Sequence, residues 1–446
     1  MTTPGRGPGV EDRSDRWCVV GAGPAGLATA KNLGDADIPY DVVDRHDSPG
    51  GVWRYGEPGS TVYASTTMIS SRRLIEFRGF AMPADWRDYP THREALSYLV
   101  AYADHFRITP NLELGRGVAS VRRCDDGWLV VLSDGTQRLY RGIVLATGHH
   151  WDPRSPDHPG TFDGTVLHSG DYRTPAMLAG LRVLVVGGGN SGSDIAVESA
   201  RIADRTFQSL RHGYHYLPKY FWGKPIDEIL AAMERWRFPA GVRRLVCSFI
   251  SRAAFGDPSS FGLPRPSRRM LEGRVVLNSE LVHQVASGAV TPKPGVSRLD
   301  GRQVHFDDGT VEDVDVIVHA TGFHASVGVD DGGLGLGTTM HLHLVDERHD
   351  GVFYAGHIQP SGGTWQLFDD QGAIIAKIIA SCSRDGRPSK PVRAVLAAYG
   401  PSDYLPPEAG RRGDPLRVDL YRYAALLRRL VRELSADDGL RRDVAP

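Results

Sequence analysis

Three glycines spaced as G-x-G-x-x-G, namely Gly21, Gly23 and Gly26, follow an apolar stretch and open a segment rich in small residues. Such glycines allow a tight turn, let the backbone approach a pyrophosphate, and let a helix pack closely on a strand. Asp44 ends the next apolar run, residues 40–43, and its carboxylate is placed to accept hydrogen bonds from ribose hydroxyls. These residues predict a dinucleotide site that selects an unphosphorylated ribose.

A second motif repeats the same glycine spacing later in the chain. Gly187, Gly189 and Gly192 follow another apolar run, with Asn190 and Ser191 between them. These are the positions at which a strand, turn and helix around a second dinucleotide require glycine. Two such motifs with the correct flanks are hard to explain by packing alone. The sequence therefore predicts two dinucleotide sites on one chain.

The strand after the second motif ends differently from the first. It has no acidic residue to repel a phosphate and offers Ser209 and Arg211 instead. An arginine fork matches a 2′-phosphate, and arginine at this position is typical of sites for NADP rather than NAD. We therefore assign NADPH to the second site. A solvated surface arginine is the alternative role for Arg211.

The elements that must position these motifs also repeat. A hairpin pattern leads into an Ala-Thr-Gly turn that contains Thr147, and a similar hairpin leads into an Ala-Thr-Gly turn that contains Thr321. This order indicates an internal structural repeat, in which each nucleotide domain ends with the same hairpin and turn. A last core strand over 352–356 and a helix over 370–380 follow the second turn.

The composition excludes several classes of protein. The chain has 446 residues, 41% of them hydrophobic and 24% charged, and its net charge of −1 gives no reason to expect nucleic acid or an anionic membrane surface as a partner. The four cysteines lie far apart, which predicts no disulfide framework and favours a cytoplasmic location. No apolar run is long enough to span a bilayer. His341 and His343 lack a third metal ligand, so we expect surface strand histidines and no metal site.

Two segments are predicted to be helical outside the nucleotide motifs. The stretch from about 224 to 272 is arginine-rich, and Trp236, Phe249 and Phe255 are interpreted as its buried faces. The tail is amphipathic over about 418–434. Core packing of its apolar stripe is the favoured interpretation, and the arginines on its other face leave a membrane-surface helix as the alternative.

A fingerprint between the two motifs carries a family resemblance. Phe162, Gly164, His168 and Tyr172 form an F-x-G-x-x-x-H-x-x-x-Y pattern, which resembles that of the flavin-containing monooxygenases. The resemblance covers about residues 16–380 and implies one FAD and one NADPH on a single chain. Baeyer–Villiger relatives usually carry Trp where this chain has Tyr172, which favours oxygenation of nitrogen or sulfur. His168 is interpreted as part of a linker that coordinates domain motion, with a buried structural histidine as the alternative.

The resemblance implies the fold class and the domains. We expect an α/β protein with two Rossmann-like dinucleotide-binding domains, the NADPH domain inserted into the FAD domain, and a small antiparallel excursion in each. The expected division is a disordered tail over 1–15, an FAD-binding domain over 16–172 and 323–446, and an NADPH-binding domain over 173–322 with a helical insertion at about 224–272. The residues expected to bind the two cofactors are Gly21, Gly23, Gly26, Asp44, Gly51, Trp53, Thr147, Gly187, Gly189, Asn190, Ser191, Gly192, Ser209, Arg211, Thr321, Gly356 and Gln371.

The chemistry implied by the resemblance needs few protein acid–base groups. NADPH reduces the flavin, O2 adds to give a peroxyflavin, and an amine or thioether takes the distal oxygen atom. The protein orients the cofactors and excludes water. The expected partners are therefore O2 and a small organic substrate, and the oligomeric state stays open, a homodimer included.

The chain departs from the family pattern in the loop after Gly51. Counting from Tyr63 places Ile69 where the family carries an Asn near the flavin, and Ile cannot donate a hydrogen bond. Either Thr67, Ser70 or a shifted register replaces the amide, or the enzyme releases hydrogen peroxide as an NADPH oxidase. The candidate catalytic residues are Ile69, Thr67, Ser70, His168 and Tyr172. A Baeyer–Villiger monooxygenase and a nucleotide-dependent redox sensor without turnover are the further alternatives.

Overall fold

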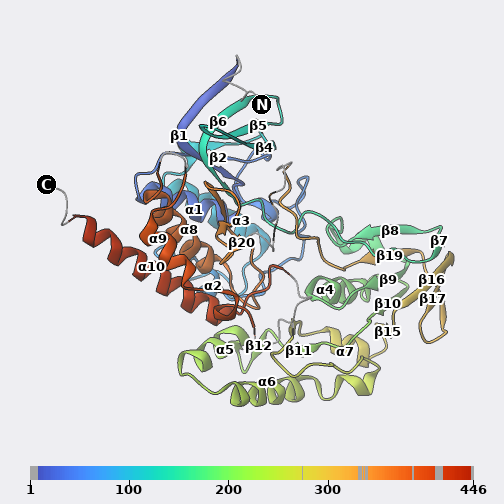
Figure 1. The fold of residues 1–446 in the computed structure, drawn as a ribbon. Helices are drawn as coiled ribbons and strands as arrows, with labels where there is room; N and C mark the ends of the chain where they lie inside the picture. Colours follow the sequence, from blue (N-terminus) through green and yellow to red (C-terminus); the bar gives the residue numbers. More distant parts are fainter. Residues whose placement is uncertain are drawn as a thin grey trace. The chain divides into compact units, whose positions relative to one another are not determined.

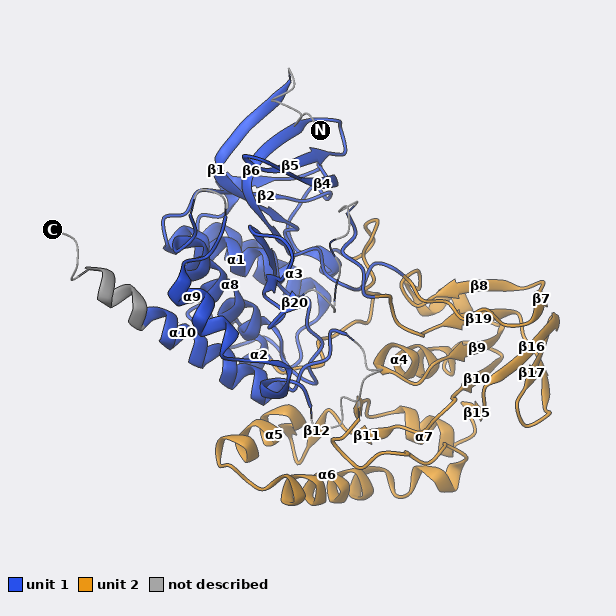
Figure 2. Cartoon of the chain, in the orientation of Figure 1, with its two compact units in different colours: residues 1–54, 72–152, 325–446 blue, residues 55–71, 153–324 orange. Residues whose placement is uncertain are grey.

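The computed structural model describes residues 9–273, 275–329, 334, 336, 340–383, 386–406 and 415–442. The chain divides into two compact units (Figures 1 and 2). Unit 1 comprises Met1–Arg54, Arg72–Asp152 and Ala325–Pro446, and unit 2 comprises Tyr55–Ser71 and Pro153–His324. Along the sequence, unit 2 therefore interrupts unit 1.

Unit 1 is built on a mainly parallel sheet. Its strand order is β20-β21-β22-β6-β1-β2-β3, and the pairs from β22 to β3 are parallel. Strands β4 and β5 extend β6 as an antiparallel excursion. The strands are β1 Val10–Val20, β2 Tyr40–Val43, β3 Leu112–Glu113, β4 Val118–Cys124, β5 Gly127–Leu132, β6 Gln137–Leu145, β20 Met340–His341, β21 Val345–Asp346 and β22 Val352–Tyr354.

The helices of unit 1 include the first helix of the dinucleotide motif and the C-terminal helices. α1 packs against α8, which also contacts α10. The helices are α1 Pro24–Asp35, α2 Arg72–Ile75, α3 His92–His105, α8 Trp365–Ala380, α9 Lys390–Ala397 and α10 Leu420–Arg442, with short 3₁₀ turns at Gly51–Trp53, Thr109–Asn111 and Pro401–Asp403. The apolar stripe of α10, which includes Tyr423, Leu427 and Leu430, is buried, so its predicted core packing is confirmed.

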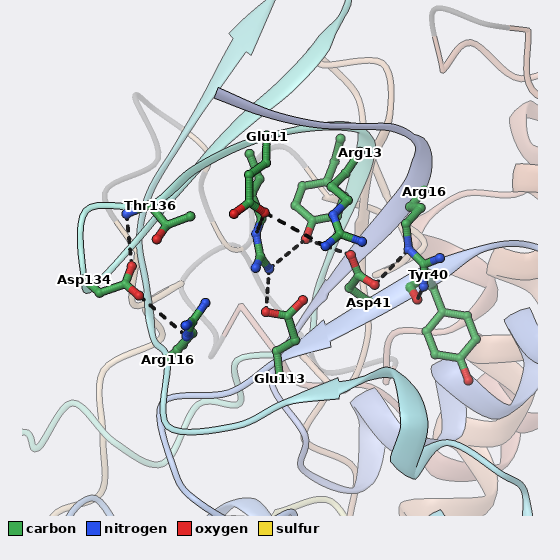
Figure 3. Close-up of polar contacts among 11 residues, drawn as sticks. Glu11, Arg13, Arg16, Tyr40, Asp41, Glu113, Arg116, Asp134 and Thr136 are labelled. Atoms are coloured by element: carbon green, nitrogen blue, oxygen red, sulfur yellow. Dashed lines mark hydrogen bonds and ion pairs between the residues drawn. The ribbon is translucent and has the colours of Figure 1, made fainter. Parts of the chain in front are cut away.

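The N-terminal segment differs from the prediction of a disordered tail over 1–15. β1 begins at Val10, and residues 10–13 pair with residues 137–140 of β6. Arg138 holds this extension because its guanidinium contacts both Glu11 and Glu113. Figure 3 labels these two glutamates. The prediction is therefore wrong for residues 10–15: their polar composition suggested disorder, but they form the start of β1. Residues 1–8 lie outside the described part of the chain.

Unit 2 contains a second parallel sheet with the order β15-β10-β9-β19-β8. A four-stranded sheet, β18-β17-β16-β7, forms its excursion. The strands of the two sheets are β7 Gly160–Phe162, β8 Thr165–His168, β9 Arg182–Val186, β10 Arg205–Ser209, β15 Thr291–Lys293, β16 Val296–Gly301, β17 Gln303–Phe306, β18 Val311–Asp313 and β19 Val316–His319. Two α/β units with parallel central sheets therefore form the fold, as the repeated motifs predict.

The remaining elements of unit 2 are four helices, two 3₁₀ turns and two short strand pairs among the described residues. The helices are α4 Asn190–Ser199, α5 Ile226–Arg235, α6 Ala240–Phe255 and α7 Leu281–Ala286, with 3₁₀ turns at Pro175–Leu178 and Pro258–Phe261. Short pairs join β11 His215–Leu217 to β14 Val275–Leu277 and β12 Tyr220–Phe221 to β13 Lys224–Pro225. Helices α5 and α6 form the predicted helical insertion.

Three further details differ from the predictions. The main segment of unit 2 begins at residue 153 rather than 173, because β7 and β8 pair with its sheets, and unit 2 also contains Tyr55–Ser71, which was predicted to belong to the FAD-binding domain. Trp236 and Phe249 are exposed rather than buried, and only Phe255 is buried. In unit 1, His343 is buried against the His357 carbonyl, so its predicted surface position is wrong.

Candidate active site

The first glycine motif forms a turn at the start of α1, which we call the first cradle. Gly23 caps α1 without a side-chain hydrogen bond, and no acidic residue lies in the first turn. The first backbone N–H groups of a helix have no partner within the helix, and the helix dipole makes that end attractive to anions. A Cβ at Gly26 would lie 1.8 Å from the Gly21 carbonyl oxygen, so Gly26 is required for helix–strand packing. The turn therefore fits a bound pyrophosphate.

Asp44 lies at the carboxyl end of β2 with both carboxylate oxygens oriented by the protein. Oδ2 accepts the Ala22 N–H at 2.6 Å, and Oδ1 accepts the His46 N–H at 2.9 Å. Burial acts to raise the pKa of Asp44, but the hydrogen bonds from His46 and Ala22 outweigh burial and hold that pKa below its usual value. The carboxylate is therefore ionised, and Oδ2 keeps a lone pair for a ribose hydroxyl.

Other residues predicted to bind a cofactor gather around this first turn. Gly51 lies beside it, because a Cβ on Gly51 would be 3.1 Å from Gly23 Cα. Trp53 packs edge-on against Trp365, with ring centroids 6.1 Å apart. The hydroxyl of Thr147, which follows β6 in the Ala-Thr-Gly turn, is buried without a hydrogen-bond partner. An orphaned buried hydroxyl costs free energy, so a ligand atom at this turn fits the site.

Gln371 was predicted to contact a cofactor, but both ends of its side-chain amide bind other groups of the protein. Its Oε1 accepts the Gly356 N–H at 2.9 Å, and its Nε2 donates to the Tyr423 hydroxyl at 2.9 Å. The side chain is fully buried. Gln371 therefore fixes the turn at Gly356 after β22 by joining it to α8 and α10.

The second glycine motif forms a similar cradle at the start of α4. Gly189 caps the helix without a side-chain hydrogen bond, at φ −74° and ψ −176°. Any residue adopts this extended conformation, and a Cβ at Gly189 would meet no atom within 4 Å. Packing therefore does not explain glycine at this position, whereas close approach of a phosphate does. Gly192 differs, because its Cβ would lie 2.4 Å from the Gly187 carbonyl oxygen.

Some of the polar residues predicted near the second nucleotide form hydrogen bonds within the protein, and the others are exposed to solvent. Asn190 Oδ1 accepts the Leu277 N–H at 3.0 Å, and Thr321 donates to the Arg154 carbonyl. Ser209 Oγ donates to the Pro294 carbonyl at 2.7 Å and so has no proton to offer a phosphate. Arg211 and Ser191 are exposed. Among these side chains, Arg211 and Ser191 can meet a phosphate without losing a described hydrogen bond, and of the two only Arg211 carries a positive charge.

The strand pairing in the second sheet places a lysine, which no sequence motif indicated, beside the end of β10. Lys293 of β15 pairs with Ser209 of β10. Its ammonium lies 2.6 Å from Glu312 and 5.4 Å from the centroid of the Phe306 ring. The short strand β15 follows the helical insertion and carries no motif, so only the pairing with β10 could have identified it.

The loop that carries Ile69 belongs to unit 2. The Tyr63 hydroxyl donates to Asp194 Oδ2 at 2.8 Å, and the Lys219 ammonium donates to the Thr67 hydroxyl at 2.7 Å. Ile69 is 42% exposed, whereas Ser70 is buried. Thr67 therefore supports the loop through Lys219, and Ile69 is the member of the three candidates that faces outward.

His168 and Tyr172 of the fingerprint both have partners within unit 2. His168 Nδ1 accepts the Gly170 N–H at 3.1 Å, so the proton lies on Nε2, which donates to the Gly322 carbonyl at 3.0 Å. Burial lowers the pKa of His168. The Tyr172 hydroxyl donates to Glu198 at 2.5 Å. A neutral imidazole with both nitrogens occupied holds a turn and does not act as a general base.

A buried polar group around α4 was missed by the sequence analysis. Asp194 accepts from Asn278 Nδ2 at 2.8 Å as well as from Tyr63. Burial raises the pKa of Asp194, and burial lowers the pKa of Lys219. These residues come from four separate segments, so no local spacing could have indicated them.

Two α/β units, each with a glycine cradle at the start of a helix, define a flavoprotein class with two dinucleotide sites. The family model of flavin-binding monooxygenase-like proteins matches residues 14–334. Among curated proteins, the chain is 31% identical to indole-3-pyruvate monooxygenase YUCCA1 of Oryza sativa subsp. japonica over 71% of this chain and 80% of the relative. It is 31% identical to human flavin-containing monooxygenase 2 over 69% of this chain and 61% of that protein.

Solved structures share the fold. An open crystal structure of cyclohexanone monooxygenase has a TM-score of 0.70 and 20% identity, covering 96% of this chain and 98% of that one. A flavin-containing monooxygenase from Stenotrophomonas maltophilia has a TM-score of 0.60 and 23% identity, covering 80% and 92%. The chain belongs to the flavin-binding monooxygenase-like family. It is an NADPH-dependent flavin monooxygenase that uses FAD.

No group of three or more His, Cys, Asp or Glu side chains in the described part of the chain is arranged to hold a metal ion. Within the same residues, no helix has both the length and the apolar character needed to cross a bilayer.

Proposed function

We propose that this enzyme transfers one oxygen atom from O2 to the nitrogen or sulfur of a small amine or thioether. FAD reduced by NADPH supplies the oxygen activation when both cofactors are bound. The first cradle, with Asp44 and Thr147, is proposed to hold FAD, and the second cradle, with Arg211, is proposed to hold NADPH. The four cysteines are free thiols, which supports a cytoplasmic location.

The observation that carries this choice of substrate is the environment of Tyr172. Its ring packs edge-on against Tyr63 at 5.5 Å between centroids, and its hydroxyl donates to the buried Glu198. A tyrosine at this position donates its hydroxyl proton to the Glu198 carboxylate. A tryptophan would carry its only donor, the indole N–H, at a different place on a larger ring. The resemblance associates tryptophan at this position with Baeyer–Villiger chemistry, so Tyr172 supports heteroatom oxygenation.

The roles of the protein groups are binding, orientation and turn formation. The N-terminal N–H groups of α1 and α4 bind phosphates, and Asp44 orients a ribose. His168 holds the turn at Gly322 through its Nε2 proton, and Gln371 holds the turn at Gly356. No protein group in this arrangement needs to exchange a proton with the substrate.

The test compares NADPH consumption with product formation. Purified enzyme is given NADPH and O2 with a tertiary amine, a thioether, a cyclic ketone or indole-3-pyruvate, the last because a plant relative carries its name. We expect amine or thioether to stimulate NADPH consumption and to appear as the N- or S-oxide in matching yield. Ester formation from the ketone, or turnover of indole-3-pyruvate alone, contradicts the proposal.

A second candidate, an NADPH oxidase, is favoured by Ile69. The resemblance expects an amide donor at this position, and the neighbouring Thr67 hydroxyl oxygen already accepts from Lys219. Hydrogen peroxide that accounts for all the NADPH consumed with every substrate identifies this activity.

A further inference from the structure

The helical insertion of unit 2 presents an unusual number of apolar side chains to solvent. More than half of the large apolar side chains that are exposed in the described chain lie between residues 220 and 261. Five of them form what we call the α6 face, namely Trp236, Phe238, Val242, Leu245 and Phe249. Trp236 is 72% exposed, Leu245 71% and Phe249 62%. Exposed patches of this kind mark interaction sites.

Helix α6 carries apolar side chains both toward the local core and toward solvent. Val242, Leu245 and Phe249 stand at i, i+3 and i+7, within roughly 60° of one another around the helix axis, and all three are exposed. Cys247 and Ile250 project away from them and are buried in the local core. Contacts within unit 2 therefore account for the buried side of α6 but not for the α6 face.

The α6 face lies in an arginine-rich segment. Residues 235–255 contain five arginines and no Asp or Glu. Arg243 and Arg244 form ion pairs with Glu234 and Glu272, which lie outside this segment. The other three, Arg235, Arg237 and Arg252, are exposed.

This charge pattern selects among the possible partners. In a two-fold contact between copies, the same patch meets itself, so the arginines of one copy would face those of the other. Like charges in opposition disfavour such an interface. An anionic surface instead complements the arginines, and Trp, Phe and Leu beside arginine are the composition of helices that lie in a membrane interface.

We propose that the α6 face binds reversibly to an anionic lipid surface, with α6 lying in the plane of the headgroups. Leu245 and Phe249 insert into the boundary between headgroups and acyl chains, and Trp236 lies at headgroup depth, where aromatic rings prefer to be. Arg235, Arg237 and Arg252 contact lipid phosphates. This proposal departs from the prediction that an anionic membrane surface is not a partner, because the net charge on which that prediction rested averages over this local excess of arginine.

The experiment measures sedimentation of the full-length FAD-containing enzyme with vesicles. Vesicles of phosphatidylcholine alone are compared with vesicles of equal parts phosphatidylcholine and phosphatidylglycerol, at low and high salt. We expect binding to the anionic vesicles that weakens at least tenfold at high salt, because the arginine contribution is screened. The double variant Leu245→Glu, Phe249→Glu is expected to bind at least tenfold more weakly, and Arg235→Gln, Arg237→Gln to lose the preference for phosphatidylglycerol.

A matched control separates this face from general stickiness. Ile202→Glu alters another exposed apolar residue of unit 2, 40% exposed, and is expected to leave vesicle binding unchanged. All variants change exposed positions, and equal thermal midpoints establish that they fold. Wild-type enzyme that stays in the supernatant with both kinds of vesicle overturns the proposal. Light scattering that shows a dimer abolished by Leu245→Glu, Phe249→Glu also overturns it, because a second copy then covers the face.

Discussion

The Tyr63 hydroxyl donates a 2.8 Å hydrogen bond to Oδ2 of Asp194. Tyr63 lies in the 55–71 loop, and Asp194 lies in α4, the helix whose first turn forms the second cradle. The loop that carries Ile69 is therefore fastened to the element that is proposed to bind NADPH. The hydrogen bond between Tyr63 and Asp194 therefore links the loop in which Ile69 departs from the family pattern to the proposed NADPH site, although the two segments are far apart in sequence.

Removing the Tyr63 hydroxyl tests this connection. Tyr63→Phe leaves the half-buried Asp194 without one of its donors, so we expect a loss of about 1–2 kcal/mol in the free energy of unfolding, measured by urea denaturation. Tyr399→Phe is the control, since that hydroxyl also bonds to a carboxylate, Glu433, but nearer the surface. An equal loss in both variants contradicts a special role for the bond to Asp194.

The two glycines of the second cradle are predicted to respond differently to substitution. Gly189→Val puts a side chain into open space at an allowed φ, so we expect an unchanged thermal midpoint and a rise of about tenfold or more in KM for NADPH. Gly192→Ala forces a Cβ to 2.4 Å from the Gly187 carbonyl oxygen and is expected to destabilise the fold itself. Gly400→Ala, at another open position, is the control for both measurements. An unchanged KM in Gly189→Val excludes phosphate approach at this residue.

Local sequence patterns predicted the elements that obey local rules. The glycine turns, the parallel strands before them and the helices after them all follow from spacing, and the structure contains them at residues 10–43 and 182–209. The apolar stripe of α10 was predicted correctly because period alone identifies its buried side.

Long-range contacts and surface partners are what the sequence could not reveal. Asp194, Lys219 and Asn278 meet only after folding. The burial of Trp236 and Phe249 was predicted from hydrophobicity, yet both are exposed, because residue type does not say whether the covering surface belongs to the same chain. Residues 10–15 became a strand because Arg138 of β6 pairs with Glu11, which no local pattern encodes.

The fully buried His357 is predicted to make unit 1 sensitive to acid. Burial, aided by the neighbouring His343, lowers the pKa of His357 from 6.5 to about 4. The unfolded chain therefore binds more protons between these values, and stability falls as the pH drops below 6.5 towards 4. His357→Gln is expected to remove up to about 2 kcal/mol of the loss between pH 6.5 and about pH 5, measured from urea midpoints. His105→Gln, at an exposed position, is the control. Parallel pH profiles for wild type and His357→Gln would show that this imidazole does not contribute.

Ile69 is predicted to limit how efficiently NADPH consumption is coupled to oxygen transfer. The side chain is 42% exposed, so Ile69→Asn is expected to change the unfolding free energy by no more than about 0.5 kcal/mol. The new amide supplies the donor that the resemblance expects, so we predict more oxygenated product and less hydrogen peroxide per NADPH, by a factor of about three or more for one added hydrogen bond. Ile202→Asn, at a similarly exposed position of unit 2, controls for the general effect of an added amide. An unchanged ratio of product to peroxide in Ile69→Asn shows that another group, such as Ser70, fulfils the role of the amide.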